Sequence, residues 1–226
     1  MLFRFKDIFT IGTIACSFLV LAFASAGSIT LASIMIIAGF FLDAMDGLWA
    51  KLTKTSNAFG GEFDRIADLA IYSMAPGILL FFVYKSFNIY LAALVGFMPL
   101  LFGSIRLARF NIKKLEYPGY WLGFPRPASA IAITGFVNSH AFIAYKPFVT
   151  GAVLVFLFGI MNVSTIPYIG HHDRKYGMWH KILIALIFML LFISIITHYF
   201  WDYIFVLFII YIVSQPLFIT KKEKKQ

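Results

Sequence analysis

Eight apolar runs, each about as long as a membrane-crossing helix, divide this chain of 226 residues. A hydrocarbon core of about 30 Å needs roughly 20 apolar residues per helix. The runs cover 9–26, 29–50, 63–84, 88–110, 126–145, 147–166, 179–198 and 201–219. Hydrophobic residues make up 61% of the sequence and charged residues 13%, which excludes an ordinary soluble domain. We therefore predict an all-α integral membrane protein, a bundle of about eight transmembrane helices forming a single membrane domain over 1–226.

The basic residues separate sharply between the two sides that eight spans would create. Seventeen of the 19 Lys and Arg fall on one side, and only Lys85 and Lys146 fall on the other. The positive-inside rule then predicts that both termini are cytoplasmic and that the basic tail, 220–226, is a topology signal. The formal charge of +9 is explained by this anchoring beside anionic lipid, so nucleic acid is not an expected partner.

Four aspartates lie at predicted membrane-spanning segments, where a charged side chain is energetically unfavourable. Asp43 and Asp46 are three residues apart near the end of the second run, and Asp64 and Asp68 are four apart at the start of the third. Either spacing places both carboxylates on one helix face. Because the two runs are consecutive and antiparallel, we expect the four carboxylates to meet near the cytoplasmic end. Like charges at membrane depth favour a bound cation, and all-oxygen ligation favours Mg²⁺ or Mn²⁺ over zinc.

A simpler interpretation is that these aspartates cap helices or pair with nearby basic side chains at the headgroups. That explanation suits one interfacial aspartate, but it does not account for four at helix-facing spacing. Glycines accompany them, Gly47 directly after Asp46, and Gly60 and Gly61 before Asp64. A glycine permits close helix packing and also leaves room for a bulky ligand.

The spacing D-x2-D-G-x2-A-K-x8-G-x3-D-x3-D, read from Asp43, resembles the signature of the CDP-alcohol phosphotransferases. Lys51 departs from it, since the family usually has Arg there. Members are membrane enzymes that transfer a phosphate-bearing group from a CDP-linked donor to an alcohol, release CMP and use a divalent metal. The resemblance places the motif-bearing catalytic part at about 29–130.

The resemblance also implies roles for individual residues. Asp43, Asp46 and Asp64 would bind metal and the donor's pyrophosphate, and Asp68 would join the metal site and act as general base. The cytidine side of the donor site would be formed by Gly47, Ala50, Lys51 and Gly60. Lys51 keeps the positive charge but lacks the forked geometry of Arg. We expect direct attack of the acceptor hydroxyl on the lipid-linked phosphorus, without a covalent enzyme intermediate.

A second stretch, 104–130, bears on the acceptor. Arg106 and Arg109 lie three apart at the end of the fourth run, level with the aspartates, and guanidinium groups suit a carboxylate or a phosphate. Topology and contact with lipid headgroups are the alternative explanation. The runs "RLARFN" and "GFPRPASA" resemble the phosphatidylserine synthases within the family. This resemblance implies CDP-diacylglycerol or CDP-archaeol as donor and L-serine as acceptor, with Arg106, Arg109, Lys113 and Arg126 at the acceptor site.

Other hypotheses remain open at this point. Glycerol 3-phosphate or inositol phosphate would also suit arginines, a cation transporter would explain the carboxylates, and a scaffold would explain the basic surface. The resemblance implies a homodimer, but no feature of the sequence assigns its interface. The apolar runs and the positive-inside orientation predict a cell-membrane location with the active site at the cytoplasmic face, where a lipid-linked donor would enter from the bilayer. His171 and His172 have no predicted role.

Overall fold

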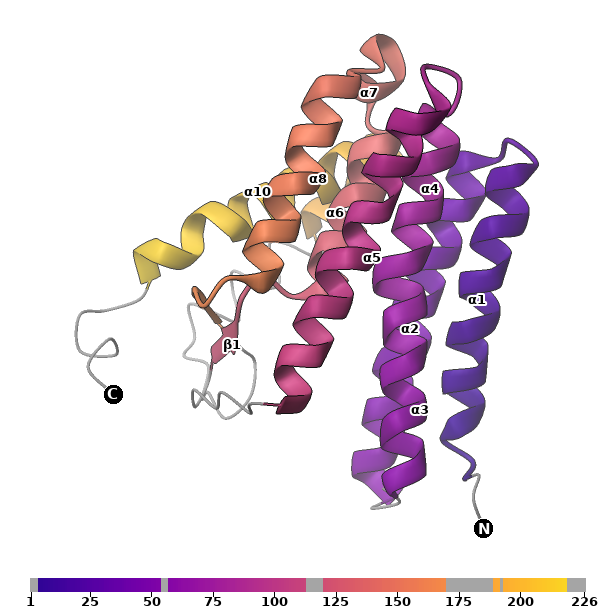
Figure 1. The fold of residues 1–226 in the computed structure, drawn as a ribbon, viewed down its shortest axis with the longest axis vertical. Helices are drawn as coiled ribbons and strands as arrows, with labels where there is room; N and C mark the ends of the chain where they lie inside the picture. Colours follow the sequence, from indigo (N-terminus) through magenta and orange to yellow (C-terminus); the bar gives the residue numbers. More distant parts are fainter. Residues whose placement is uncertain (1–3, 54–56, 113–119, 170–188, 192, 219–226) are drawn as a thin grey trace.

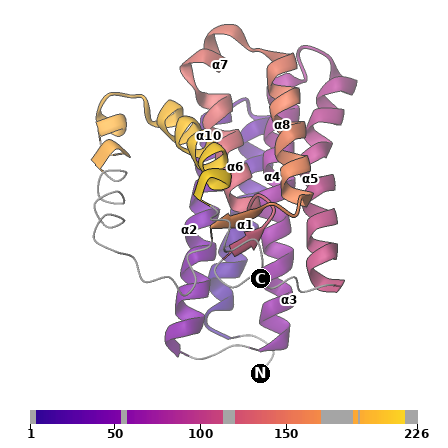
Figure 2. The ribbon, with the colours of Figure 1, turned by 90° about the vertical axis from the view of Figure 1, so that its left-hand side faces the viewer.

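The computed structural model is a helical bundle, described here for residues 4–53, 57–112, 120–169, 189–191 and 193–218. Its elements are α1 (Asp7–Ser25), α2 (Ile29–Thr53), α3 (Ala58–Leu69), η1 (Ala70–Met74), α4 (Ala75–Tyr84), α5 (Ile89–Ile112), β1 (Tyr120–Leu122), α6 (Arg126–Asn138), α7 (His140–Tyr145), α8 (Phe148–Val163), β2 (Pro167–Ile169) and α10 (Phe200–Phe218). Most of the helices run roughly parallel or antiparallel, whereas α10 lies obliquely beside α6 (Figures 1 and 2).

Four helical stretches within the described residues are long and apolar enough to cross a membrane: Asp7–Ser25, Ile29–Thr53, Ala58–Tyr84 and Ile89–Ile112. They correspond to the first four predicted runs. The fifth run differs from prediction, because Ser139 leaves the helical conformation and separates α6 from α7. The sixth and eighth runs form α8 and α10, and most of the seventh lies outside the described residues. The count of eight spans therefore stays a prediction.

The third span contains one π-helical turn, η1, between α3 and α4. Pro76 follows this turn, and a proline has no N–H to donate and crowds the carbonyl four residues earlier. We attribute the π turn to this loss of a backbone hydrogen bond in the helix before Pro76. The turn begins two residues after Asp68, and single π turns inside α-helices are frequent at functional sites.

Glycines allow two close contacts between neighbouring helices. Gly27 adopts a left-handed conformation (φ 82°) between α1 and α2, where Ser28 N–H donates to Phe23 C=O in the pattern of a Schellman cap. Between α4 and α5, a Cβ on Gly77 would lie 2.2 Å from the carbonyl oxygen of Gly96. The two backbones therefore touch, as small residues allow in membrane bundles.

The fold is helical as predicted, and it also contains a short antiparallel ribbon that the sequence did not indicate. β1 pairs with β2 in the register Tyr120↔Ile169, Trp121↔Tyr168 and Leu122↔Pro167. Gly123 N–H and Phe124 N–H continue the contact by donating to Ile166 C=O and Met161 C=O. The ribbon connects the segment before α6 to the segment after α8, which no helical periodicity could have indicated.

The surface and the charges agree with a membrane protein. Large apolar side chains such as Phe18, Phe41 and Val149 are 68%, 61% and 72% exposed, as expected for a bundle that faces lipid. Among the described basic residues, Lys6 precedes α1 and Lys51 and Arg109 lie in the last turns of α2 and α5, whereas Lys85 and Lys146 directly follow α4 and α7.

Candidate active site

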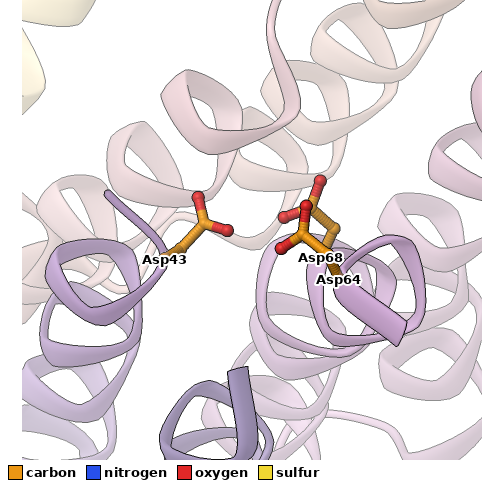
Figure 3. Close-up of side chains that lie close together, drawn as sticks. All are labelled: Asp43, Asp64 and Asp68. Carbon is orange, nitrogen blue, oxygen red and sulfur yellow. The ribbon is translucent and has the colours of Figure 1, made fainter. Parts of the chain in front are cut away.

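Three aspartates from neighbouring helices converge in the half of the bundle nearer the N-terminus. Asp43 comes from α2, and Asp64 and Asp68 come from α3. One carboxylate oxygen from each lies within 4.8 Å of those of the other two, and Figure 3 shows Asp43 facing the pair across the gap between the helices. All three side chains are partly buried. We call Asp43, Asp64 and Asp68 the aspartate trio.

The structure does not place Asp46 in this trio. Its carboxylate is buried and accepts a hydrogen bond from the Thr10 hydroxyl on α1. Three residues at about 100° each leave Asp46 rotated by about 60° from Asp43 around α2. That rotation turns Asp46 toward α1, whereas Asp43 faces α3. Three of the four carboxylates that were expected to cluster thus lie close together. A role for Asp46 in binding metal or donor stays a prediction.

Two side chains that are not members of the trio form hydrogen bonds to its carboxylates. The Tyr72 hydroxyl, in the π turn, donates to Asp43 Oδ2 over 2.8 Å. Arg126 at the start of α6 donates from Nη2 to Asp68 Oδ2 over 3.0 Å, with side chains 12% and 24% exposed. Asp68 Oδ1 is buried and has no hydrogen-bond partner among the described residues. The sequence analysis did not identify Tyr72, although its position four residues after Asp68 was a usable signal.

This donor set fits a divalent cation. Three carboxylates so close repel one another, and a single ion pair with Arg126 offsets only part of that charge. Oxygen ligands suit hard cations such as Mg²⁺ and Mn²⁺. Tyr72 and Arg126, which donate to Asp43 and Asp68, provide the outer contacts that orient metal ligands.

The residues expected on the cytidine side lie on the same two helices. Gly47 is exposed, with no atom within 4 Å of the position of a Cβ, while Ala50 is half-buried and Lys51 is exposed. Gly60 is buried, and a Cβ there would lie 2.6 Å from both Asn57 Oδ1 and Lys6 Nζ. Gly47 therefore has free space beside it, whereas a side chain at Gly60 would displace the ends of the Asn57 and Lys6 side chains. Their binding roles stay predictions.

The arginines expected at the acceptor have other partners. Arg106 is buried and donates to Asn162 C=O over 2.7 Å. Arg109 donates to Val163 C=O and, over 3.1 Å, to Ser164 C=O. These carbonyls end α8, where a cation also complements the helix dipole. The structure thus gives both arginines a structural role. Their predicted acceptor contact is untested, and Lys113, His171 and His172 lie outside the described residues.

Comparison with known proteins agrees with this geometry. The family model described as CDP-alcohol phosphatidyltransferase matches residues 5–162. A CDP-diacylglycerol–serine O-phosphatidyltransferase of Helicobacter pylori (strain ATCC 700392 / 26695) is 30% identical over 197 residues, covering 85% of this chain and 83% of that protein. A protein of the same name from Methanocaldococcus jannaschii is 33% identical over 59% of this chain and 61% of its own length.

An archaetidylserine synthase of Methanothermobacter thermautotrophicus is 27% identical over 63% of this chain and 59% of its own length. The matched family region contains the whole aspartate trio, the π turn and Arg126. The family expected from the aspartate spacing is therefore confirmed, and the chain belongs to the CDP-alcohol phosphatidyltransferases.

Proposed function

We propose that this protein transfers the phosphatidyl group of CDP-diacylglycerol, or the archaetidyl group of CDP-archaeol, to the hydroxyl of L-serine and releases CMP. The aspartate trio, spaced for a divalent cation inside the matched family region, is the observation that carries the reaction type. The names of the relatives support serine as acceptor and leave both ester and ether lipid as donor.

Asp68 is the residue that we assign as general base. It has one oxygen bonded to Arg126 and the other without a partner among the described residues, so Oδ1 is available to a hydroxyl. In the proposed step the serine oxygen attacks the lipid-linked phosphorus, the bond from that phosphorus to CMP breaks, and the hydroxyl proton passes to Asp68.

The other residues bind and orient. A Mg²⁺ or Mn²⁺ ion held by the trio would neutralise the pyrophosphate and the departing CMP. Tyr72 fixes the orientation of Asp43, and Arg126 fixes that of Asp68. Such positioning supplies much of the catalysis in phosphoryl transfer. Family membership favours this enzyme over the cation-transporter hypothesis, because transport would not require the CDP-alcohol signature.

The test is CMP and lipid formation by purified protein with CDP-diacylglycerol, Mn²⁺ and either L-serine or glycerol 3-phosphate. We expect product with serine alone, and a loss of about 10²- to 10⁴-fold in kcat for Asp68→Asn. Glu62→Gln is the matched control, because Glu62 lies on the same helix but only forms an exposed ion pair with Arg65. Product with glycerol 3-phosphate in place of serine would overturn the acceptor and leave the reaction type standing.

The proposal includes a cytoplasmic site, cytoplasmic termini and a homodimer. Cys16 is the single cysteine, so a Cys16→Ser background permits labelling of one introduced thiol at a time. A cysteine replacing Glu62 should react with an impermeant reagent only from the cytoplasmic side, and one replacing Lys85 only from the opposite side. The reverse pattern would invert the orientation. Cross-linking in the native membrane tests the dimer.

A further inference from the structure

A buried ion pair at the start of α1 has no role in the mechanism described so far. Lys6 Nζ lies 3.0 Å from Asp7 Oδ1, and the two side chains are 5% and 1% exposed. Burying two charges removes their hydration, and their mutual attraction often does not offset that cost. Such a pair is weak evidence for stabilisation, so a function for one of its two charges has to be considered.

The two members of this pair are held differently. Asp7 Oδ2 accepts the backbone N–H of Arg4 over 2.7 Å, and an acidic side chain in the first turn also complements the helix dipole. Asp7 Oδ1, the oxygen near Lys6, has no hydrogen-bond partner among the described residues, so its contact with the ammonium group is ionic only. An ammonium group has three N–H donors on a flexible stem. Lys6 can therefore move to another anion while Asp7 keeps its backbone hydrogen bond.

The ammonium group of Lys6 lies one helical turn from the aspartate trio. Helix α1 packs against α3, and a Cβ on Gly60 would lie 2.6 Å from Lys6 Nζ and 3.0 Å from Asp7 Oδ1. Gly60 and Asp64 are four residues apart, so they are neighbours on one face of α3. Lys6 thus brings a positive charge from a third helix, α1, to the face of α3 that carries Asp64.

We propose that Lys6 binds the diphosphate of the CDP-linked donor by exchanging its contact with Asp7 for the phosphate oxygens. The inference rests on the proposed function, in which the diphosphate lies next to the trio. A diphosphate offers several charged oxygens, and charge-assisted hydrogen bonds to them would replace an ionic contact that lacks hydrogen-bond geometry. Arg126 already donates to Asp68, whereas Lys6 is a cation that no member of the trio holds.

The experiment measures the Kd for CDP, the soluble part of the donor, by calorimetry with Mn²⁺ present, together with KM for CDP-diacylglycerol and KM for L-serine. We expect Lys6→Met to raise the Kd for CDP and KM for the donor about 10- to 100-fold, the effect of losing one hydrogen bond between charged groups, with KM for serine unchanged. Arg65→Met is the matched control, because it also removes a positive charge near the start of α3 but breaks only an exposed ion pair with Glu62.

Two further variants separate donor binding from a purely structural ion pair. Asp7→Asn removes the anion that competes for Lys6, so we expect it to bind CDP at least as tightly as the wild type. Lys6→Met/Asp7→Asn removes both buried charges and should bind CDP as weakly as Lys6→Met alone, whereas a structural pair predicts recovery in this double variant.

The outcomes distinguish this inference from the proposed function. Wild-type affinity for CDP in the double variant, or a Kd in Lys6→Met no higher than in Arg65→Met, overturns the inference while the proposed function stands. A wild-type protein that releases no CMP from CDP-diacylglycerol and L-serine overturns both.

Discussion

Replacing Tyr72 with phenylalanine tests whether the aspartate trio is a metal site. The Tyr72 hydroxyl donates a 2.8 Å hydrogen bond to Asp43 Oδ2, and the side chain is 2% exposed, so water cannot readily take its place. A hydrogen bond to a charged group contributes about 1.5–3 kcal/mol. Outer-shell partners of metal ligands typically change metal affinity about 10- to 100-fold, which corresponds to the same range of free energy.

The assay follows CMP release as a function of Mn²⁺ concentration at saturating CDP-diacylglycerol and L-serine. We expect Tyr72→Phe to need about 10- to 100-fold more Mn²⁺ for half-maximal rate and to recover most of the kcat at high Mn²⁺. Tyr84→Phe is the matched control, because Tyr84 is a buried tyrosine of the same continuous span whose hydroxyl is 3.5 Å from a neutral carbonyl of Pro147. Equal Mn²⁺ dependence in the two variants would refute the assignment of Asp43 as a ligand held by Tyr72.

Three further outcomes follow from the packing and the site. Chelation with EDTA should stop CMP release and added Mn²⁺ should restore it; serine-dependent turnover that persists in EDTA contradicts the role of the trio. Gly77→Ala should lower the free energy of unfolding by about 1–3 kcal/mol, measured in detergent, because its Cβ would lie 2.2 Å from a backbone oxygen. Gly47→Ala, inside α2 with nothing within 4 Å of its Cβ, should lose no stability and can gain up to about 1 kcal/mol, and equal losses in the two variants would refute the packing argument. Arg109→Ala should destabilise by about 2–3 kcal/mol through the lost bonds to α8, whereas Arg65→Ala, whose ion pair is exposed, should cost about 0.5 kcal/mol or less. If instead Arg109→Ala mainly raises KM for serine, the arginine contacts the acceptor as the sequence suggested.

Local regularities of the sequence were sufficient for the membrane class and for the reaction family. Apolar runs of membrane length predicted the four long helices, because a span must satisfy its own backbone hydrogen bonds and face lipid. The four-residue spacing of Asp64 and Asp68 placed both on one face of α3, since helical geometry fixes that relation within a single element.

Relations between elements were beyond the sequence. The spacing of Asp43 and Asp46 did not reveal which of them faces α3, because a rotation of about 60° becomes decisive only when α1 is packed against both α2 and α3. Thr10 then binds Asp46, and Tyr72 binds Asp43. The chemistry of the aspartates was visible in the sequence, but the helix packing selected the members of the trio.

The arginines show the same division. A guanidinium at the end of a span can bind a substrate or a helix terminus. The sequence does not show which of these two partners lies within hydrogen-bond distance. Because α5 packs against α8, Arg106 and Arg109 contact the backbone carbonyls at the end of α8, while Arg126 alone among the three contacts the trio. The sequence by itself determined which groups can carry charge and bind metal, since that depends on residue type and helical period. Only the tertiary structure decided which groups meet, because contacts between helices depend on packing across long separations in the chain.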